Sequence, residues 1–281
     1  MFGRSRSDPC HCLKCKRGGC YPKAKPREGL FRGCRGALTV RNRMPSRAVT
    51  SSAHQCPIAC MAEGDQESPK EKEEKALIRA ISADRFATYL VASGHDTARA
   101  LDLYIWNAAI GEAFHTPIQG VEIALRNSVN YGLIKEYGDD WWRNPTLAAL
   151  LTGERTGDLA EVLRRIANRN LTLCNGQVVA GLSFGFWVGM LAPRYNPDIW
   201  SKHLRLSFPH LPADKGRYDL FAGAKDIAFL RNRISHHEPL IARNISQDYA
   251  SIIEFLKWLC PTKVKWIRAN TRISQVLRLK P

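Results

Sequence analysis

The sequence has no apolar segment long enough to cross a lipid bilayer. Its longest apolar run, residues 178–192, is 15 residues long, whereas a transmembrane helix needs about 20. The N-terminus also lacks the apolar stretch and the small-residue cleavage site of a secretory signal. We therefore expect a cytoplasmic protein that makes no membrane contact, with residues 178–192 forming a buried core helix.

Cysteine is scarce after residue 60, where only Cys174 and Cys260 occur. This scarcity excludes a disulfide framework and is typical of a protein from a reducing compartment. The other cysteines lie in the first 60 residues, where one pair, Cys12-x-x-Cys15, has zinc-like spacing. Its remaining ligands would come from a second group without zinc spacing: His54, Cys56 and Cys60. We expect neither a metal site nor a cofactor.

Residues 1–60 differ from the rest of the chain in charge and pattern. They hold 13 of the 42 Lys and Arg residues but only two of the 26 acidic residues, so 11 of the 16 net positive charges lie there. The segment shows no sustained hydrophobic period of a helix or strand. We interpret residues 1–60 as a disordered basic extension, or as the product of a start codon assigned too far upstream, and residues 61–281 as the folded domain. The excess charge is therefore weak evidence that the fold has a polyanionic partner.

Helix signals dominate the folded part of the sequence. No stretch alternates apolar and polar residues convincingly over six positions, so a β-sheet is not expected. Ser82 and Asp96 are suitable N-caps, Gly94 can end a helix, and Pro117 can begin a helix that Gly138 ends. Further helices are predicted over 158–169, 177–192, 197–206, 212–237, 247–259 and 263–279, the last as one helix or two. The sequence predicts an all-α helical bundle.

The tryptophans and the basic tail each have two interpretations. Trp106, Trp142, Trp187 and Trp200 lie among apolar neighbours, which favours core packing over stacking with nucleic-acid bases. Residues 263–280 carry six basic residues and no acidic residue. This tail could follow a phosphate backbone, or it could be a solvated helix face.

Seven features of the sequence occur in one order: Arg85-Phe86 with Tyr89-Leu90; Tyr104-Ile105-Trp106-Asn107; Glu122-Ile123-Ala124-Leu125-Arg126-Asn127; Tyr137-Gly138 with Trp141-Trp142; Leu182-Ser183-Phe184-Gly185-Phe186-Trp187; Trp200; and Leu230-Arg231-Asn232-Arg233-Ile234-Ser235-His236-His237-Glu238-Pro239. Together they resemble the Abi-like (abortive infection) family of the HEPN group, which contains helical nucleases and nucleotide-binding modules. The resemblance spans roughly residues 80–281 and leaves out residues 1–60. It implies a HEPN-like bundle with a dimeric cleft. It also implies a role in phage defence, or as a toxin that an antitoxin protein could neutralise.

Residues 231–237 concentrate groups that can cleave RNA without a metal. Such cleavage needs a base for the 2′-hydroxyl proton, an acid for the departing 5′-oxygen and a fixed cation for the phosphate charge. Histidine suits the first two tasks because its pKa is ordinarily about 6.5. Arginine suits the third because its planar fork grips two phosphate oxygens. We predict that Arg231 stabilises phosphate charge and His236 is the acid or base, with Asn232 and His237 as further catalytic candidates.

The spacing of Arg231 and His236 sets a geometric condition. On a straight helix the two residues lie about 140° apart, so they do not share a face. One solution is that the helix loosens before Pro239, which disfavours α conformation at Glu238. The other is that a second copy completes the site, because a two-fold dimer brings the same helix end from each chain together. The second solution predicts a homodimer.

The candidate support residues are polar side chains near this segment or on an otherwise apolar helix: Arg233, Glu238, Glu122, Arg126 and Asn127. Some of them also have a purely structural interpretation. Glu122 and Arg126 could form a routine one-turn salt bridge, and Arg233 could pair with Glu238 or Asp226.

These observations lead to two expectations about function. The first is a metal-independent RNA endonuclease of the HEPN type, acting in phage defence or as a toxin. The alternative is a non-catalytic HEPN module that binds RNA, a nucleotide or a partner protein. The presence of both Arg231 and His236 favours the nuclease.

Overall fold

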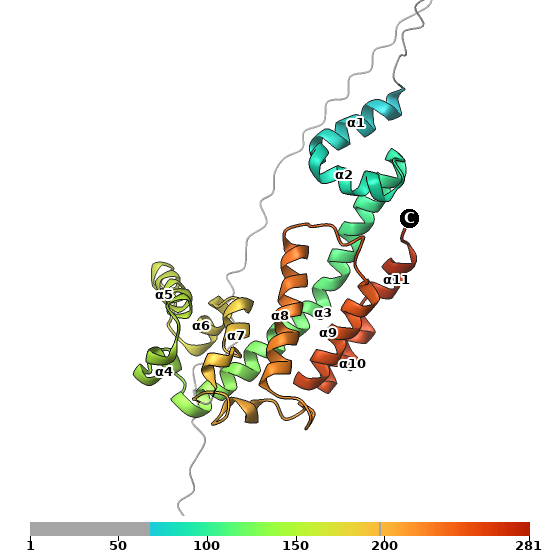
Figure 1. The fold of residues 1–281 in the computed structure, drawn as a ribbon. Helices are drawn as coiled ribbons and strands as arrows, with labels where there is room; N and C mark the ends of the chain where they lie inside the picture. The colour runs from blue at the N-terminus through green and yellow to red at the C-terminus, as the bar shows by residue number, and fades with distance from the viewer. Residues whose placement is uncertain (1–67, 197) are drawn as a thin grey trace, which may run out of the picture. The chain divides into compact units, whose positions relative to one another are not determined.

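The computed structural model describes residues 68–196 and 198–281, so the predicted extension over residues 1–60 lies outside the described residues. Regular structure in the described part is entirely helical, which confirms the all-α prediction (Figure 1). The α-helices are α1 (Pro69–Ile81), α2 (Ala83–Ala92), α3 (Thr97–Tyr137), α4 (Pro145–Leu150), α5 (Gly153–Asn168), α6 (Asn175–Gly181), α7 (Phe184–Gly189), α8 (Arg217–Ser235), α9 (Ile245–Leu259), α10 (Pro261–Asn270) and α11 (Ile273–Arg278). Three short 3-10 helices are η1 (Trp141–Arg143), η2 (Pro193–Tyr195) and η3 (Leu204–Ser207). None of these helices is both long and apolar enough to cross a bilayer.

Helix α3, at 41 residues, is the element against which α2, α7, α8, α9, α10 and α11 pack. Its predicted ends are confirmed. The Asp96 side chain accepts a hydrogen bond from the Arg99 backbone N–H (3.0 Å), as an N-cap should. Gly138 ends the helix with a φ of +83°, a conformation that glycine adopts without a steric cost.

The prediction that Pro117 begins a helix is wrong, because Pro117 lies in the interior of α3. A proline inside a helix removes one backbone hydrogen bond and costs about 3 kcal/mol. The helix nevertheless continues, and the residues on both sides of Pro117 show why. Phe114, Ile118 and Val121 are all buried against other helices, and burying such side chains contributes about 1.5–3 kcal/mol each. Tertiary packing therefore outweighs the local helix signal.

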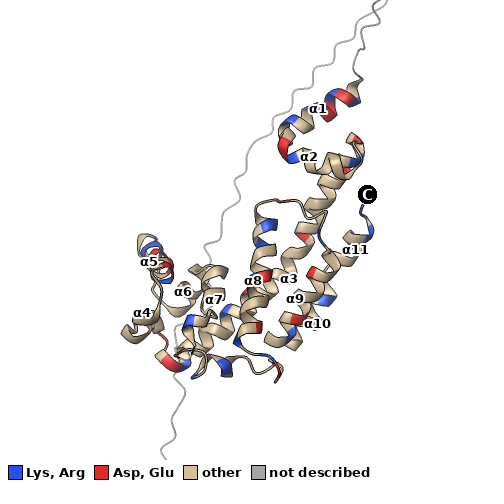
Figure 2. Ribbon diagram, in the orientation of Figure 1, with Lys and Arg blue, Asp and Glu red and all other residues tan. Residues whose placement is uncertain are grey.

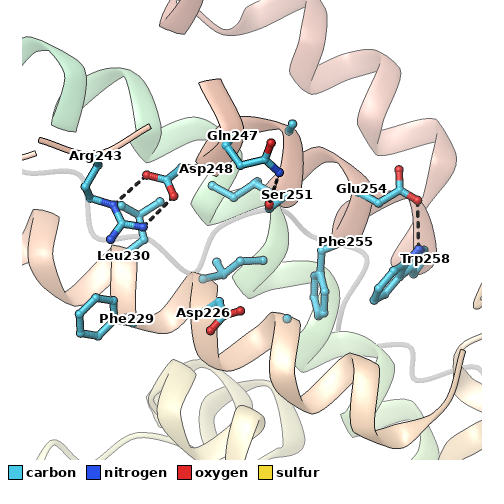
Figure 3. A pocket seen from close by; sticks show the side chains of 14 residues that line it. Asp226, Phe229, Leu230, Arg243, Gln247, Asp248, Ser251, Glu254, Phe255 and Trp258 are labelled. Carbon is cyan, nitrogen blue, oxygen red and sulfur yellow. Dashed lines mark hydrogen bonds and ion pairs between the residues drawn. The ribbon is translucent and has the colours of Figure 1, made fainter. Parts of the chain in front are cut away.

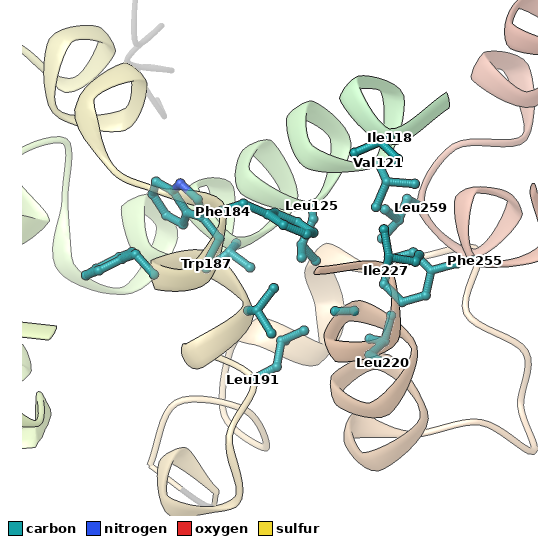
Figure 4. Close-up of a cluster of buried hydrophobic side chains, with 14 of the residues drawn as sticks. Ile118, Val121, Leu125, Phe184, Trp187, Leu191, Leu220, Ile227, Phe255 and Leu259 are labelled. Carbon is teal, nitrogen blue, oxygen red and sulfur yellow. The ribbon is translucent and has the colours of Figure 1, made fainter. Parts of the chain in front are cut away.

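The main core joins α3 to α7, α8 and α9. Leu125 of α3, Trp187 of α7, Ile227 of α8 and Phe255 of α9 are among the side chains that meet there (Figure 4). The four tryptophans assigned to the core are buried, with between 1% and 7% of their surface exposed: Trp106, Trp142, Trp187 and Trp200. Their burial confirms the packing interpretation over base stacking.

Several predicted helix boundaries are corrected by the structure. The predicted helix over 177–192 is buried but divided into α6 and α7, because the Ser183 side chain accepts from the Phe186 backbone N–H and caps a new helix. In the range 197–206, the described residues form turns and the start of η3 rather than an α-helix. Helix α8 begins at Arg217, later than predicted. The tail forms the two-helix alternative, α10 and α11.

Candidate functional site

The candidate catalytic segment lies at the C-terminal end of α8. The helix ends at Ser235, with His236 as its C-cap. The backbone N–H of His237 donates to the Ile234 carbonyl (3.0 Å), and that of Glu238 donates to the Arg233 carbonyl (2.8 Å). These two bonds form a Schellman motif, whose C′ position requires a left-handed backbone. His237 occupies that position with a φ of +55°. The helix therefore ends before Pro239 but only after His236, whose backbone N–H still donates to the Asn232 carbonyl (2.9 Å). Arg231 and His236 thus stay on different faces of α8, and the first geometric solution does not bring them together.

Two side chains from other helices hold this turn in place. Asn107 of α3 is buried, and its Oδ1 accepts a hydrogen bond from the Leu240 backbone N–H (2.6 Å). Its Nδ2 donates to the Glu238 carbonyl at 3.4 Å. Arg85 of α2 donates through Nη1 to the His237 carbonyl (3.0 Å). Neither Arg85 nor Asn107 was predicted from the sequence to support this turn.

Arg231 is paired across the α3–α8 contact with Glu122. Its Nε donates to Glu122 Oε1 (3.1 Å), and its Nη1 lies 3.4 Å from Asn232 Oδ1. The side chains of Arg231 and Glu122 remain 43% and 29% exposed, so their ion pair contributes at most about 1 kcal/mol to stability. These contacts fix the direction of the guanidinium, and Nη2 makes no hydrogen bond within the described residues.

The alternative in which Glu122 pairs with Arg126 is not the arrangement found in the described residues, where Glu122 pairs with Arg231. The Nε atom of Arg126 is buried without a hydrogen-bond partner. Burial lowers the pKa of Lys263, and the positive charge of Arg126 lowers it further. The charge of Arg126 is therefore felt by Lys263 near the start of α10. Asn127 is exposed on α3. Neither side chain contacts the end of α8 through a hydrogen bond or ion pair in the described part of the chain.

Arg233 is used within the turn itself. Its Nε lies 3.4 Å from Glu238 Oε2, and its Nη2 donates to the Pro239 carbonyl (2.9 Å). The guanidinium also lies over the Phe229 ring, 5.8 Å from the ring centroid. Of the two partners considered for Arg233, the structure pairs it with Glu238. This arrangement makes Arg233 a residue that stabilises the helix end.

A cavity of about 500 Å³ opens beside the turn, between α2, α3 and the end of α8. Such a volume lies within the range of small-ligand pockets. The lining residues that carry polar side chains are Tyr89, Tyr104, Asn107, Glu112, His115, Ser235, His237 and Glu238. His237 and Glu238 therefore face the cavity, whereas His236 is exposed and is not part of its lining. His115 was not predicted. The available signal was its position on α3, seven residues before Glu122 and so on nearly the same helix face.

A larger cavity, about 710 Å³, lies between α8 and α9 (Figure 3). Leu230 and Phe255 contribute apolar surface, and the Phe229 side chain is 57% exposed. The Arg243 guanidinium pairs with both carboxylate oxygens of Asp248 (2.8 and 2.7 Å). None of the predicted catalytic residues lines this second cavity.

Charges of both signs are interspersed on α1 and α5 (Figure 2), whereas α10 and α11 carry basic residues and no acidic residue. Two basic residues of the tail make contacts within the chain. Arg272 pairs with Glu112 at the rim of the smaller cavity, and Lys280 donates to the Ile241 carbonyl (3.0 Å). The tail is therefore partly anchored to the fold. The described residues contain no group of three or more His, Cys, Asp or Glu side chains placed to hold a metal ion.

Comparison of the chain with protein-family models, with curated proteins and with solved structures found no match in any of the three. The functional argument therefore depends on the residues and geometry of the site.

Proposed function

We propose that this chain is a metal-independent RNA endonuclease of the HEPN type and resembles the Abi-like proteins in its role. It would act in the cytoplasm in phage defence, or as a toxin that an antitoxin protein neutralises. One observation supports this proposal most: the end of α8 carries Arg231 and His236, and the turn that follows places His237 at a cavity of about 500 Å³. Asn107 and Arg85 hold this turn in place.

The residue types of the turn match the needs of RNA cleavage. Attack of the 2′-hydroxyl on phosphorus breaks the bond to the 5′-oxygen and leaves a 2′,3′-cyclic phosphate and a 5′-hydroxyl. A histidine takes the 2′-hydroxyl proton, and a second group returns a proton to the 5′-oxygen. Arg231, oriented by Glu122 (3.1 Å), stabilises the negative charge that builds on the phosphate oxygens.

A homodimer is part of the proposal. His236 is exposed at the end of α8 and faces neither of the two larger cavities. A two-fold contact at this helix end would place His236 of one chain near the turn of the other. RNA and a second copy are thus the expected partners, together with an antitoxin if the chain is a toxin.

The test compares RNA cleavage in EDTA by the wild-type chain and by Arg231→Ala and His236→Ala. Each substitution should lower the rate by about 10² or more, as expected for charge-stabilising and proton-transfer groups. Arg164→Ala is the matched control, because among the described residues Arg164 pairs only with Glu161, on the exposed face of α5. Sedimentation of the same preparations should show a dimer. Cleavage that survives both site substitutions would overturn the catalytic assignment.

The cavity between α8 and α9 favours the second candidate function, a non-catalytic module that binds a partner protein. Exposed Phe229 offers an apolar contact and Asp226, also exposed, offers a carboxylate for a basic side chain (Figure 3). If a folded, dimeric preparation cuts no RNA, this function replaces the nuclease. In that case Phe229→Ala together with Asp226→Lys should abolish partner binding.

A further inference from the structure

Three residues on one face of α3 contact α8 or the chain just beyond it. Asn107 bonds to the chain just beyond α8, at Glu238 and Leu240. A Cβ atom at Gly111 would lie 3.5 Å from Ile234 Cγ2. Glu122 pairs with Arg231. Moving toward the C-terminus of α3, the contacts fall progressively closer to the N-terminus of α8. The two helices therefore run antiparallel at this contact.

His115 lies on this same face. At about 100° per residue, positions 107, 111, 115 and 122 fall within about 80° of one another around the helix. Position 115 is one turn beyond Gly111 and two turns before Glu122. Along α3, His115 therefore lies between the contact with Ile234 and the ion pair of Arg231, about 10 Å from Glu122.

His115 and His237 line one cavity, of about 500 Å³. Neither imidazole makes a hydrogen bond or ion pair within the described part of the chain, so their ring nitrogens are free for a ligand. The other titratable groups that face them are Tyr89 from α2, Tyr104 and Glu112 from α3, and Glu238 from the turn. Both carboxylates already have cationic partners, Arg272 for Glu112 and Arg233 for Glu238.

We propose that His115 is a second catalytic residue and forms, with His237 of the same chain, the acid–base pair of the proposed ribonuclease. This proposal rests on the proposed function and reassigns proton transfer from His236 to His115 and His237. His236 then acts on the rate through the two-fold contact at the end of α8, which His236→Ala would disrupt. One imidazole is neutral and takes the proton from the 2′-hydroxyl as its oxygen bonds to phosphorus. The other is protonated and gives its proton to the 5′-oxygen as the P–O5′ bond breaks. One proton is accepted and one is donated, so no co-reactant is needed.

The proposal assigns proton transfer to two histidines of one chain, even within a dimer. It therefore differs from a site in which the histidines come from opposite chains. The difference can be measured with mixed dimers of His115→Asn and His237→Ala chains. Opposite-chain sites would regain part of the wild-type rate in the mixture, because one of the two sites would be intact. A pair within one chain regains nothing.

The experiment uses the full chain and a single-stranded RNA that the wild type cuts. His115→Asn should lower kcat by about 10² or more with KM within a few fold, and should remove one limb of the pH–rate profile. His210→Asn, at another exposed histidine, is the matched control and should keep the wild-type rate and profile. Mixing the His115→Asn and His237→Ala chains should restore no activity.

The outcomes separate this proposal from the proposed function. If the wild type cuts RNA and His115→Asn cuts it at the same rate, or if mixed dimers regain activity, the His115 proposal fails and the ribonuclease stands. If the folded wild type cuts no RNA, the proposed function fails and this proposal fails with it. Because His115 is exposed, His115→Asn should unfold at the wild-type temperature, which distinguishes loss of catalysis from loss of fold.

Discussion

Replacing His237 by glycine should stabilise the fold and remove catalysis. His237 holds the C′ position of the Schellman motif at the end of α8, with a φ of +55°. This left-handed conformation costs a residue with a Cβ about 1–2 kcal/mol. Glycine adopts it freely but loses about 0.5–1 kcal/mol more backbone entropy on folding than alanine. The His237 side chain is exposed, so little packing is lost. The net expectation is a gain of about 0.5–1 kcal/mol in the free energy of unfolding.

Two other helices provide the comparison for this substitution. Helices α2 and α5 end in the same pair of backbone hydrogen bonds, with Gly94 and Asn170 at the C′ position. Asn170 has a φ of +51°, and asparagine tolerates this conformation better than most residues. Asn170→Gly should therefore gain less stability than His237→Gly. The histidine at the end of α8 is the unfavourable choice for stability, which is consistent with a role in function.

Chemical denaturation and RNA cleavage should be measured on the same preparations. For a domain of this size, the expected gain corresponds to a rise in Tm of about 1–4 °C. The cleavage rate should fall by about 10² or more. A His237→Gly chain less stable than the wild type would contradict the backbone argument. A stabilised chain with the wild-type cleavage rate would show that catalysis does not depend on the strained histidine.

Two further predictions concern stability. Asn107→Ala leaves the buried Leu240 N–H without its acceptor (2.6 Å) and should lower the free energy of unfolding by about 1–3 kcal/mol in urea titrations. Asn127→Ala, on the exposed face of α3, is its control and should change little. Burial raises the pKa of Tyr89 to about 12, whereas a tyrosine in the unfolded chain has a pKa of about 10. As the pH rises past about 10, Tyr89 therefore ionises first in the unfolded chain. The contribution of Tyr89 to stability should be complete below that pH and decline up to about pH 12. Tyr89→Phe should remove this decline from the alkaline unfolding curve, and an unchanged curve would refute it.

The fold could be predicted where the signals are local. The caps at Ser82 and Asp96 and the stop at Gly138 depend on backbone groups a few residues away, and all three are as predicted. Pro117 and the 177–192 segment were predicted wrongly. At Pro117, burial of the neighbouring side chains against other helices decides the structure, and the sequence of α3 alone does not show that burial.

The site shows the same division between local and long-range information. Residues 231–237 could be proposed as a site from their chemistry because the relevant groups are adjacent. The pairing of Glu122 could not, because its partner Arg231 is 109 residues away and the local rule favoured Arg126. The end of α8 was also placed too late, because a Schellman motif usually has glycine or asparagine at the position that His237 occupies.

The most direct test of the central claim is the chemistry of the RNA ends that the full chain produces in EDTA. One substrate should be all ribose, and the second should carry a single deoxyribose at the cut site. We predict a 2′,3′-cyclic phosphate and a 5′-hydroxyl from the first substrate and no cleavage of the second at that position. A 3′-hydroxyl with a 5′-phosphate, or cleavage beside the deoxyribose, would contradict it.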